Sequence, residues 1–185
     1  RLKRDEFPVI EIVPRQIITR KKMVRIGKGI FKPDTGRDLL KAVVIERHKA
    51  TGNIGKAIVR GFGLKAGAIA STIAHDSHNI VAVGTQDEDI LAAVKEVERL
   101  QGGLVVVAGG EVLAALPLPI AGLLSDGPLE TVVRQLSGVE AAAATLGCAL
   151  ASPFSTLSFL ALPVIPQLRL TDLGLVDVDR FELLH

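Results

Sequence analysis

The sequence predicts a mixed α/β domain, in which a mixed β-sheet packs against helices. Three observations indicate this class. Short apolar runs rich in β-branched residues recur along the chain, as in the strands of a buried sheet. One of these runs is followed by a segment with apolar residues at helical spacing. The chain has 185 residues, of which 48% are hydrophobic, and this is enough for one sizeable domain with an appendage.

The first 35 residues differ in charge from the rest. Residues 1–32 hold 10 Lys and Arg against 3 Asp and Glu, which leaves 12 against 17 for the remainder. Cations alternate with apolar residues in this segment, as in a strand with one solvated face. We therefore predict two regions, 1–35 and 36–185. The first is expected to be a β-rich segment that completes a β layer with chain upstream, outside the core of the second.

Five strands are predicted in the second region, each from a short apolar run. They are expected at residues 41–46, 68–73, 80–83, 104–108 and 111–116. The last two are separated by Gly109-Gly110, which predicts a hairpin. The proline-containing segment 160–166 is expected to be extended.

Three helices are predicted. A short one is expected to follow the glycine-rich turn at residues 51–55 and to end at Gly61. A longer one is expected after Thr85 as N-cap, with acidic residues in its first turn, which favours the helix dipole. A third is expected from Pro128, capped by Ser125 or Asp126. The expected buried stripe of the second helix consists of Ile90, Leu91, Val94, Val97 and Leu100.

Composition argues against two kinds of partner. The basic arm has no aromatic residue among its cations between Arg15 and Arg25, and the chain has no Tyr or Trp, so it lacks platforms for stacking bases. The longest apolar stretch, residues 157–168, contains two prolines and is shorter than the roughly 18 residues of a membrane span. The single Cys148 is expected to be a buried, unpaired thiol. We expect no nucleic-acid or membrane partner and a cytoplasmic location.

The candidate site is a run of five polar residues, His75-Asp76-Ser77-His78-Asn79, between two predicted strands. Polar side chains at the end of a strand are well placed for function. Two imidazoles with a carboxylate and an amide can bind a polar heterocycle, relay protons or, as an alternative, ligate a metal through His75 and His78. A second alternative is a turn in which Asp76 and Asn79 bond to nearby backbone.

Two further motifs have weaker signals. Residues 51–56 resemble a phosphate loop, but they lack its spacing and its Lys-Ser/Thr pair, and a tight turn accounts for the glycines equally well. Ser125-Asp126 offers a carboxylate to a substrate amino group, and a helix cap is the alternative for the same pair.

Taken together, these segments resemble the C-terminal region of the bacterial and archaeal adenine deaminases. The resemblance runs from about residue 9 to residue 181, in ordered blocks. The blocks are Glu46-Arg47-His48 and residues 51–55, 61–65, 67–70, 75–79, 102–107, 116–123, 125–126, 157–166, 170–172 and 174–178. Two departures are Leu124 and Ser155, where the family pattern has methionine. These change packing rather than chemistry.

The resemblance implies hydrolytic deamination of adenine to hypoxanthine and ammonia in purine salvage, by a metal-dependent enzyme of the amidohydrolase superfamily. It also implies a homo-oligomer, and a divalent metal, manganese, iron or zinc, on a barrel domain upstream. This chain has no His-x-His motif for such a barrel, so we expect it to be the C-terminal part of a longer polypeptide and inactive alone, with no catalytic residue of its own.

For this region the resemblance implies a role at the mouth of the active site. His75, Asp76, His78 and Asn79, with Ser125 and Asp126, are then expected to bind or gate adenine. Two alternatives differ in class: a purine-binding module without catalysis, and an oligomerisation domain that places its apolar 116–124 surface against a partner.

Overall fold

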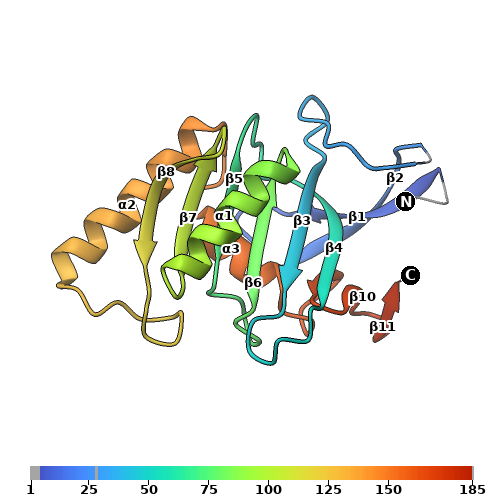
Figure 1. The fold of residues 1–185 in the computed structure, drawn as a ribbon. Helices are drawn as coiled ribbons and strands as arrows, with labels where there is room; N and C mark the ends of the chain where they lie inside the picture. Colours follow the sequence, from blue (N-terminus) through green and yellow to red (C-terminus); the bar gives the residue numbers. More distant parts are fainter. Residues whose placement is uncertain (1–4, 28, 185) are drawn as a thin grey trace.

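The computed structural model describes residues 5–27 and 29–184, and an eight-stranded mixed sheet forms its centre (Figure 1). The strands of this sheet are β1 (Glu6–Ile12), β2 (Thr19–Arg25), β3 (Leu40–Ile45), β4 (Ile54–Arg60), β5 (Ala68–Ser71), β6 (Ile80–Gly84), β7 (Gly103–Ala108) and β8 (Glu111–Pro117). Their order across the sheet is β2-β1-β4-β3-β6-β5-β7-β8. A smaller antiparallel sheet contains β9 (Leu168–Thr171), β10 (Gly174–Asp177) and β11 (Glu182–Leu184). The predicted α/β class is confirmed.

Helices cover both faces of the large sheet. Helix α1 (Asp87–Arg99) lies on one face, over β5, β6 and β7, as Figure 1 shows. On the other face lie α2 (Leu129–Thr145), against β7 and β8, and α3 (Pro153–Leu160), against β5 and β6. Burial is therefore two-sided in the central strands, and every residue of β5 and β6 is buried. Continuous apolar runs such as these are typical of strands with both faces covered.

The segment expected to be a short helix is instead strand β4. It pairs with β3 in antiparallel register, from Leu40 opposite Val59 to Ile45 opposite Ile54. This ladder excludes a helix, although burial follows the pleat of the strand only in part, because the adjacent Ile58 and Val59 are both buried. Gly55 lies inside this strand, where a Cβ would stand 1.8 Å from the carbonyl oxygen of Thr171. The glycine therefore marks close backbone approach rather than a helix start.

Helix α1 is where the sequence predicts it, but its buried stripe is narrower. Ile90 and Val97 are buried, and Val94 and Leu100 are half-buried. Leu91 is 54% exposed, so its predicted burial is wrong. The helix covers only part of the sheet face against which it packs. Leu91 lies at the edge of the helix–sheet contact.

Both predicted N-caps are wrong. Gln86 holds the N-cap position of α1, while the Thr85 hydroxyl donates to the carbonyl of Gly67. Helix α2 begins after Pro128, and neither Ser125 nor Asp126 caps it. In each case the polar side chain lies one or more residues too early to reach the first free N–H groups of the helix.

Helix α3 has no counterpart in the sequence prediction, and the segment after it is not extended. Residues 161–167 form turns. The helix has only eight residues, three of them Ser or Thr, and its apolar residues form no amphipathic stripe that would reveal it. Its one sequence signal is Pro153 in the first turn.

Strands β1 and β2 extend the large sheet, so the expectation that residues 1–35 lie outside the core of the rest is wrong. Ile10 and Ile12 belong to the same buried cluster as Leu40 and Val59. That these strands also complete a β layer with upstream chain stays a prediction. Among the helices of the described residues, none has the length and apolarity needed to cross a membrane.

Candidate functional site

The polar run predicted as the site lies in the loop between β5 and β6, at one end of the large sheet. Three other segments meet it there. The turn between β3 and β4 contributes Arg47 and Asn53, the loop after β8 contributes Ala121, and the turn between β9 and β10 contributes Asp172. The strand prediction was right for β5 and β6, so the loop is where the sequence places it.

Asn79 anchors the loop. Its side-chain amide donates to Asp172 Oδ1 over 3.3 Å, and its Oδ1 accepts from the backbone N–H of Arg47 over 3.3 Å. The other oxygen of Asp172 accepts from Asn53 Nδ2 over 3.2 Å. Asn79 is buried, so these bonds satisfy polar atoms that water does not reach. The amide thus ties together three segments that are distant in sequence.

Arg47 makes a second set of ties. Its Nε donates to the carbonyl of His78 over 2.6 Å, and its Nη2 donates to the carbonyl of Ala121 over 2.7 Å. Burial lowers the pKa of the guanidinium from its ordinary value. At Gly122 a Cβ would lie 2.6 Å from Arg47 Nη2, so the glycine leaves room for the side chain. Arg47 therefore fixes the backbone of the histidine loop against the loop after β8.

The turn at residues 46–53 is built around the Glu46 carboxylate. That carboxylate accepts from the backbone N–H groups of His48, Lys49 and Thr51 and from the Thr51 hydroxyl. These bonds, with the one from Thr51 N–H the largest cause, lower the pKa of Glu46 to about 2. Within residues 51–56, the Thr51 N–H is used by Glu46, the Asn53 N–H donates to the Thr51 hydroxyl, and residues 54–56 belong to β4. The segment is therefore a turn that leads into a strand.

The two imidazoles of the loop lie side by side. The ring centroids of His75 and His78 are 6.0 Å apart in an edge arrangement, and the His75 ring packs on Phe159 of α3 with centroids 4.8 Å apart. The backbone N–H of His75 donates to the carbonyl of Ser158, also on α3. Helix α3, which was not predicted from the sequence, therefore holds His75 in place through contacts with both its ring and its backbone.

His78 carries an unused polar atom. Its Nδ1 is buried and has no hydrogen-bond partner among the described residues. Burial lowers the pKa of this imidazole, and the nearby His75 and Arg47 lower it further. A neutral imidazole with a free ring nitrogen can donate or accept one hydrogen bond.

Asp76 is exposed, and within the described part of the chain it has no hydrogen bond or ion pair. The turn interpretation is therefore wrong for Asp76, because it does not bond to nearby backbone. The hydrogen bonds of the Asn79 side chain go to distant segments instead. The imidazole of His75 likewise forms no hydrogen bond with any described residue. Exposed Asp76 and half-buried His75 thus offer free polar groups to a ligand, whereas His78 Nδ1 is unpaired but covered by protein atoms.

Ser125 and Asp126 lie in the loop that follows the Ala121 contact with Arg47. The Ser125 hydroxyl accepts from the backbone N–H of Gly127 over 3.1 Å, and Asp126 is exposed. The structure brings their loop beside the histidine loop, but no hydrogen bond joins either residue to it within residues 5–27 and 29–184.

The metal alternative lacks a sufficient set of ligands among the residues that the structure describes. No group of three His, Cys, Asp or Glu side chains among the described residues is arranged to hold an ion. His75 and His78 alone are short of the four ligands of a structural site or the three of a catalytic one. We therefore derive no chemistry from a metal in this domain.

Arg47, Asn53 and Asp172 organise the site, and none of them was predicted as a site residue. Their hydrogen bonds to one another and to the histidine loop span 31 to 119 positions of sequence, for which local spacing gives no signal. The available signal was their presence in the blocks that carry the family resemblance.

Comparison with known proteins decides the family. The model of the adenine deaminase C-terminal domain matches residues 16–182. The chain belongs to this family. The chain is 58% identical over 181 residues to the adenine deaminase of Dehalococcoides mccartyi strain ATCC BAA-2266, and these residues are 97% of this chain and 32% of that protein.

Other adenine deaminases give the same picture. Identity is 56% over 180 residues with that of Archaeoglobus fulgidus and 53% over 180 residues with that of Halalkalibacterium halodurans, covering 97% and 96% of this chain. These residues are 32% and 31% of the two proteins. The adenine deaminase C-terminal domain thus spans about a third of the length of the curated relatives it matches.

Proposed function

We propose that this chain is the C-terminal part of an adenine deaminase, which hydrolyses adenine to hypoxanthine and ammonia. Support comes from the family model, which matches most of the chain, and from relatives at 53 to 58% identity that are themselves named adenine deaminases. The chain spans about a third of those relatives, so the remaining catalytic parts are proposed to lie elsewhere in the same polypeptide.

In the proposed reaction, water adds to C6 of the purine ring and the exocyclic amine leaves as ammonia. We propose that the divalent metal, manganese, iron or zinc, is held by an upstream barrel domain of the same polypeptide. This chain contributes no metal group within its described residues, so its part in the reaction is to bind and enclose the substrate.

The observation that carries this role is the set of unused polar groups on a fixed loop. His75, Asp76 and His78 Nδ1 have no partner among the described residues, while Asn79 and Arg47 hold the loop in place. Adenine presents ring-nitrogen acceptors and an amino donor, which neutral imidazole and carboxylate groups complement. We propose that these groups hold or gate adenine at the mouth of the active site.

Ser125 and Asp126 are proposed as a second contact to substrate from the adjacent loop. Homo-oligomerisation, implied by the resemblance, also stays a proposal. Of the apolar surface at residues 116–124, Leu116 and Leu118 are buried, whereas Ile120 and Leu124 are exposed. Only the far end of that surface is available to another subunit.

The test is kinetic and uses the complete enzyme. His75→Ala and His78→Ala should each lower kcat/KM for adenine by roughly 10²-fold, the loss expected when a positioning group is removed. Metal content and circular dichroism should not change. Lys95→Ala, on the exposed side of α1, is the matched control and should behave as wild type. Wild-type kinetics in both histidine variants, with metal and fold intact, would contradict the proposed role.

A further inference from the structure

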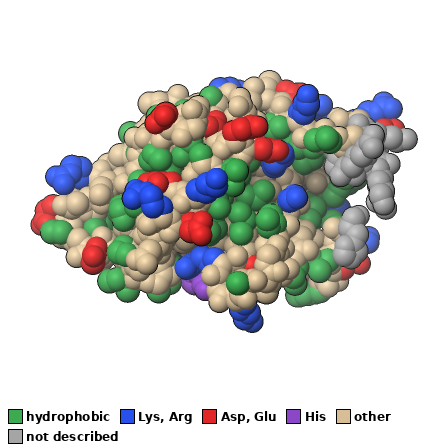
Figure 2. Space-filling view, viewed as in Figure 1, with side chains coloured by type: hydrophobic (Ala, Val, Ile, Leu, Met, Phe, Trp, Pro, Cys, Tyr) green, Lys and Arg blue, Asp and Glu red, His purple; other side chains and the backbone are tan. Residues whose placement is uncertain are grey.

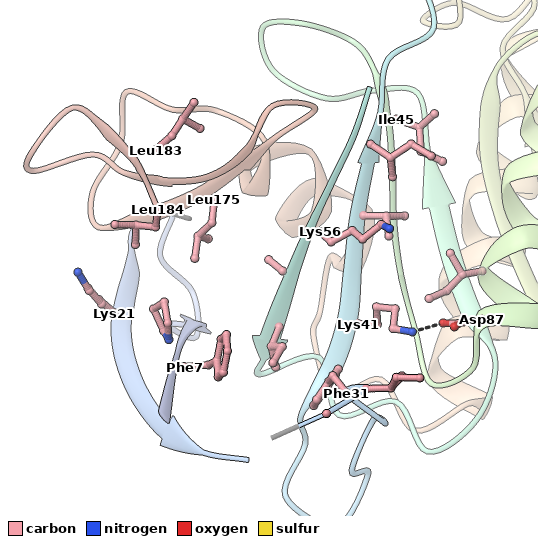
Figure 3. Close-up of a pocket in the computed structure, with 18 of the residues that line it drawn as sticks. Phe7, Lys21, Phe31, Lys41, Ile45, Lys56, Asp87, Leu175, Leu183 and Leu184 are labelled. Atoms are coloured by element: carbon pink, nitrogen blue, oxygen red, sulfur yellow. Dashed lines mark hydrogen bonds and ion pairs between the residues drawn. The ribbon is translucent and has the colours of Figure 1, made fainter. Parts of the chain in front are cut away.

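The face of the large sheet that carries α1 is only half covered. Beside the helix is a hollow of about 940 Å³, and Figure 2 shows apolar side chains and lysines gathered around it. Its floor is the α1-side surface of β3 and β4, including Val43, Ile45 and Ile54. Leu91 and Val94 of α1 form one wall, and β1, β2 and β11 form the other (Figure 3). We name this cavity the α1-side hollow.

The hollow exists because the sheet opens at one seam. Strands β1 and β4 pair only at Ile10 with Val59 and at Glu11 with Arg60. Beyond these pairs the two strands separate, as Figure 3 shows. Large apolar side chains of its floor and walls are consequently left in solvent: Met23, Ile54 and Leu91 are each about half exposed. Exposed apolar groups gathered around one cavity mark a surface that another element covers.

We propose that the α1-side hollow is the seat of the polypeptide that precedes this domain in full-length adenine deaminases. The proposal rests on the proposed function, in which this chain is part of such a protein. The relatives are about three times as long as the matched region, and that region is a C-terminal domain, so chain precedes it. Glu6, Phe7 and Pro8 of β1 line the hollow, so the preceding chain arrives at its rim.

Charge adds a requirement for the occupant. Of the three lysines that line the hollow, Lys21 pairs with Asp177 and Lys41 pairs with Asp87. Lys56 has no ion pair with a described residue, and it projects from β4 beside the apolar floor (Figure 3). The docked segment should therefore present apolar side chains to the floor and a carboxylate to Lys56.

The location couples the hollow to the histidine loop. Ile45, at one end of the floor, is directly followed by Glu46 and Arg47, and it pairs with Ile80, the residue after Asn79. A body seated in the hollow would thus lie beside the loop that is proposed to meet the substrate.

The experiment is site-specific photocrosslinking in the complete polypeptide. A benzoylphenylalanine at position 91 reports on the hollow, and one at Glu98, exposed on the same helix and outside the hollow, is the control. Position 91 should crosslink to peptides that precede this domain in the same molecule, with a yield at least ten times that of position 98. A tagged and an untagged copy, mixed before irradiation, distinguish crosslinks within a chain from crosslinks between copies.

Three outcomes would overturn the proposal: no crosslink from position 91, equal yields from both positions, or crosslinks only between copies, which would assign the hollow to a subunit interface. None of these readouts depends on deamination. Failure of the histidine variants to affect kinetics would therefore reject the role of the loop in substrate binding without changing the crosslinking result.

Discussion

At the residue scale, the loop combines fixed and free side chains. Asn79 is buried and its side-chain oxygen and nitrogen both have hydrogen-bond partners, whereas Nδ1 of the preceding residue, His78, has no partner among the described residues. A buried polar atom without a hydrogen-bond partner lowers the stability of the folded state. Its presence in the fold therefore indicates that the atom has a function. The sequence pointed to this run of residues, but it could not distinguish the anchor from the free groups, because that depends on Asp172 and Arg47.

The lowered pKa of His78 makes a prediction about stability. Its pKa is below the ordinary value of 6.5, chiefly because burial disfavours the charged ring. Between the folded pKa and 6.5 the unfolded state binds more protons than the folded state, so the free energy of unfolding falls as pH drops through this window. Above 6.5 the imidazole is neutral in both states and contributes no slope.

Urea unfolding of wild type and His78→Gln between pH 7.5 and 5.0 measures this effect. The wild-type free energy of unfolding should decrease more steeply toward pH 5 than that of the variant, which lacks the titrating ring. Parallel curves for the two proteins would contradict the burial of a neutral imidazole at this position.

At the element scale, the two glycines Gly55 and Gly138 contrast in their surroundings. A Cβ at Gly55 in β4 would collide with the Thr171 carbonyl, whereas at Gly138 in α2 it would meet nothing within 4 Å. Gly55→Ala should destabilise the domain by about 1–3 kcal/mol or more, because the backbone must move to relieve the overlap. Gly138→Ala should stabilise it by about 1 kcal/mol, because alanine is the better helix former.

Chemical denaturation of both variants checks these opposite signs. The Gly138 variant also serves as the control that glycine replacement in itself does not destabilise the chain. If Gly55→Ala unfolds at the wild-type midpoint, then β4 does not pack against the turn between β9 and β10 as described.

The elements also show what could be predicted from sequence. Strands such as β6 and β7 were found because continuous β-branched runs have few other interpretations, and α1 was found because its apolar residues recur at helical spacing. Strand β4 was missed because its glycine suggested a turn, and α3 was missed because its eight residues form no amphipathic stripe. Leu91 was misplaced because helical periodicity gives the apolar face of a helix but not how much of it the sheet covers.

At the scale of the whole molecule, the change in charge near Pro33 suggested a domain boundary, but the hydrophobic core continues across it. The charge pattern reports the solvated side of β1 and β2, whereas their other side packs into the domain. Beyond the core contacts, Lys21 of β2 pairs with Asp177 of β10, and Thr19 bonds to the start of β9. Strand β2 thus connects the large sheet to the small one.

This connection predicts that a chain starting at residue 36 will not fold stably. It would lose Val9 and Ile10, which are fully buried, and Ile12, which is 7% exposed. Each such side chain contributes about 1.5–3 kcal/mol when buried. Their loss together is comparable to the roughly 5–15 kcal/mol that stabilises a typical domain. In urea, with circular dichroism as the signal, the shortened chain should show no cooperative transition, and a midpoint equal to that of the 185-residue chain would instead establish residues 36–185 as an independent domain.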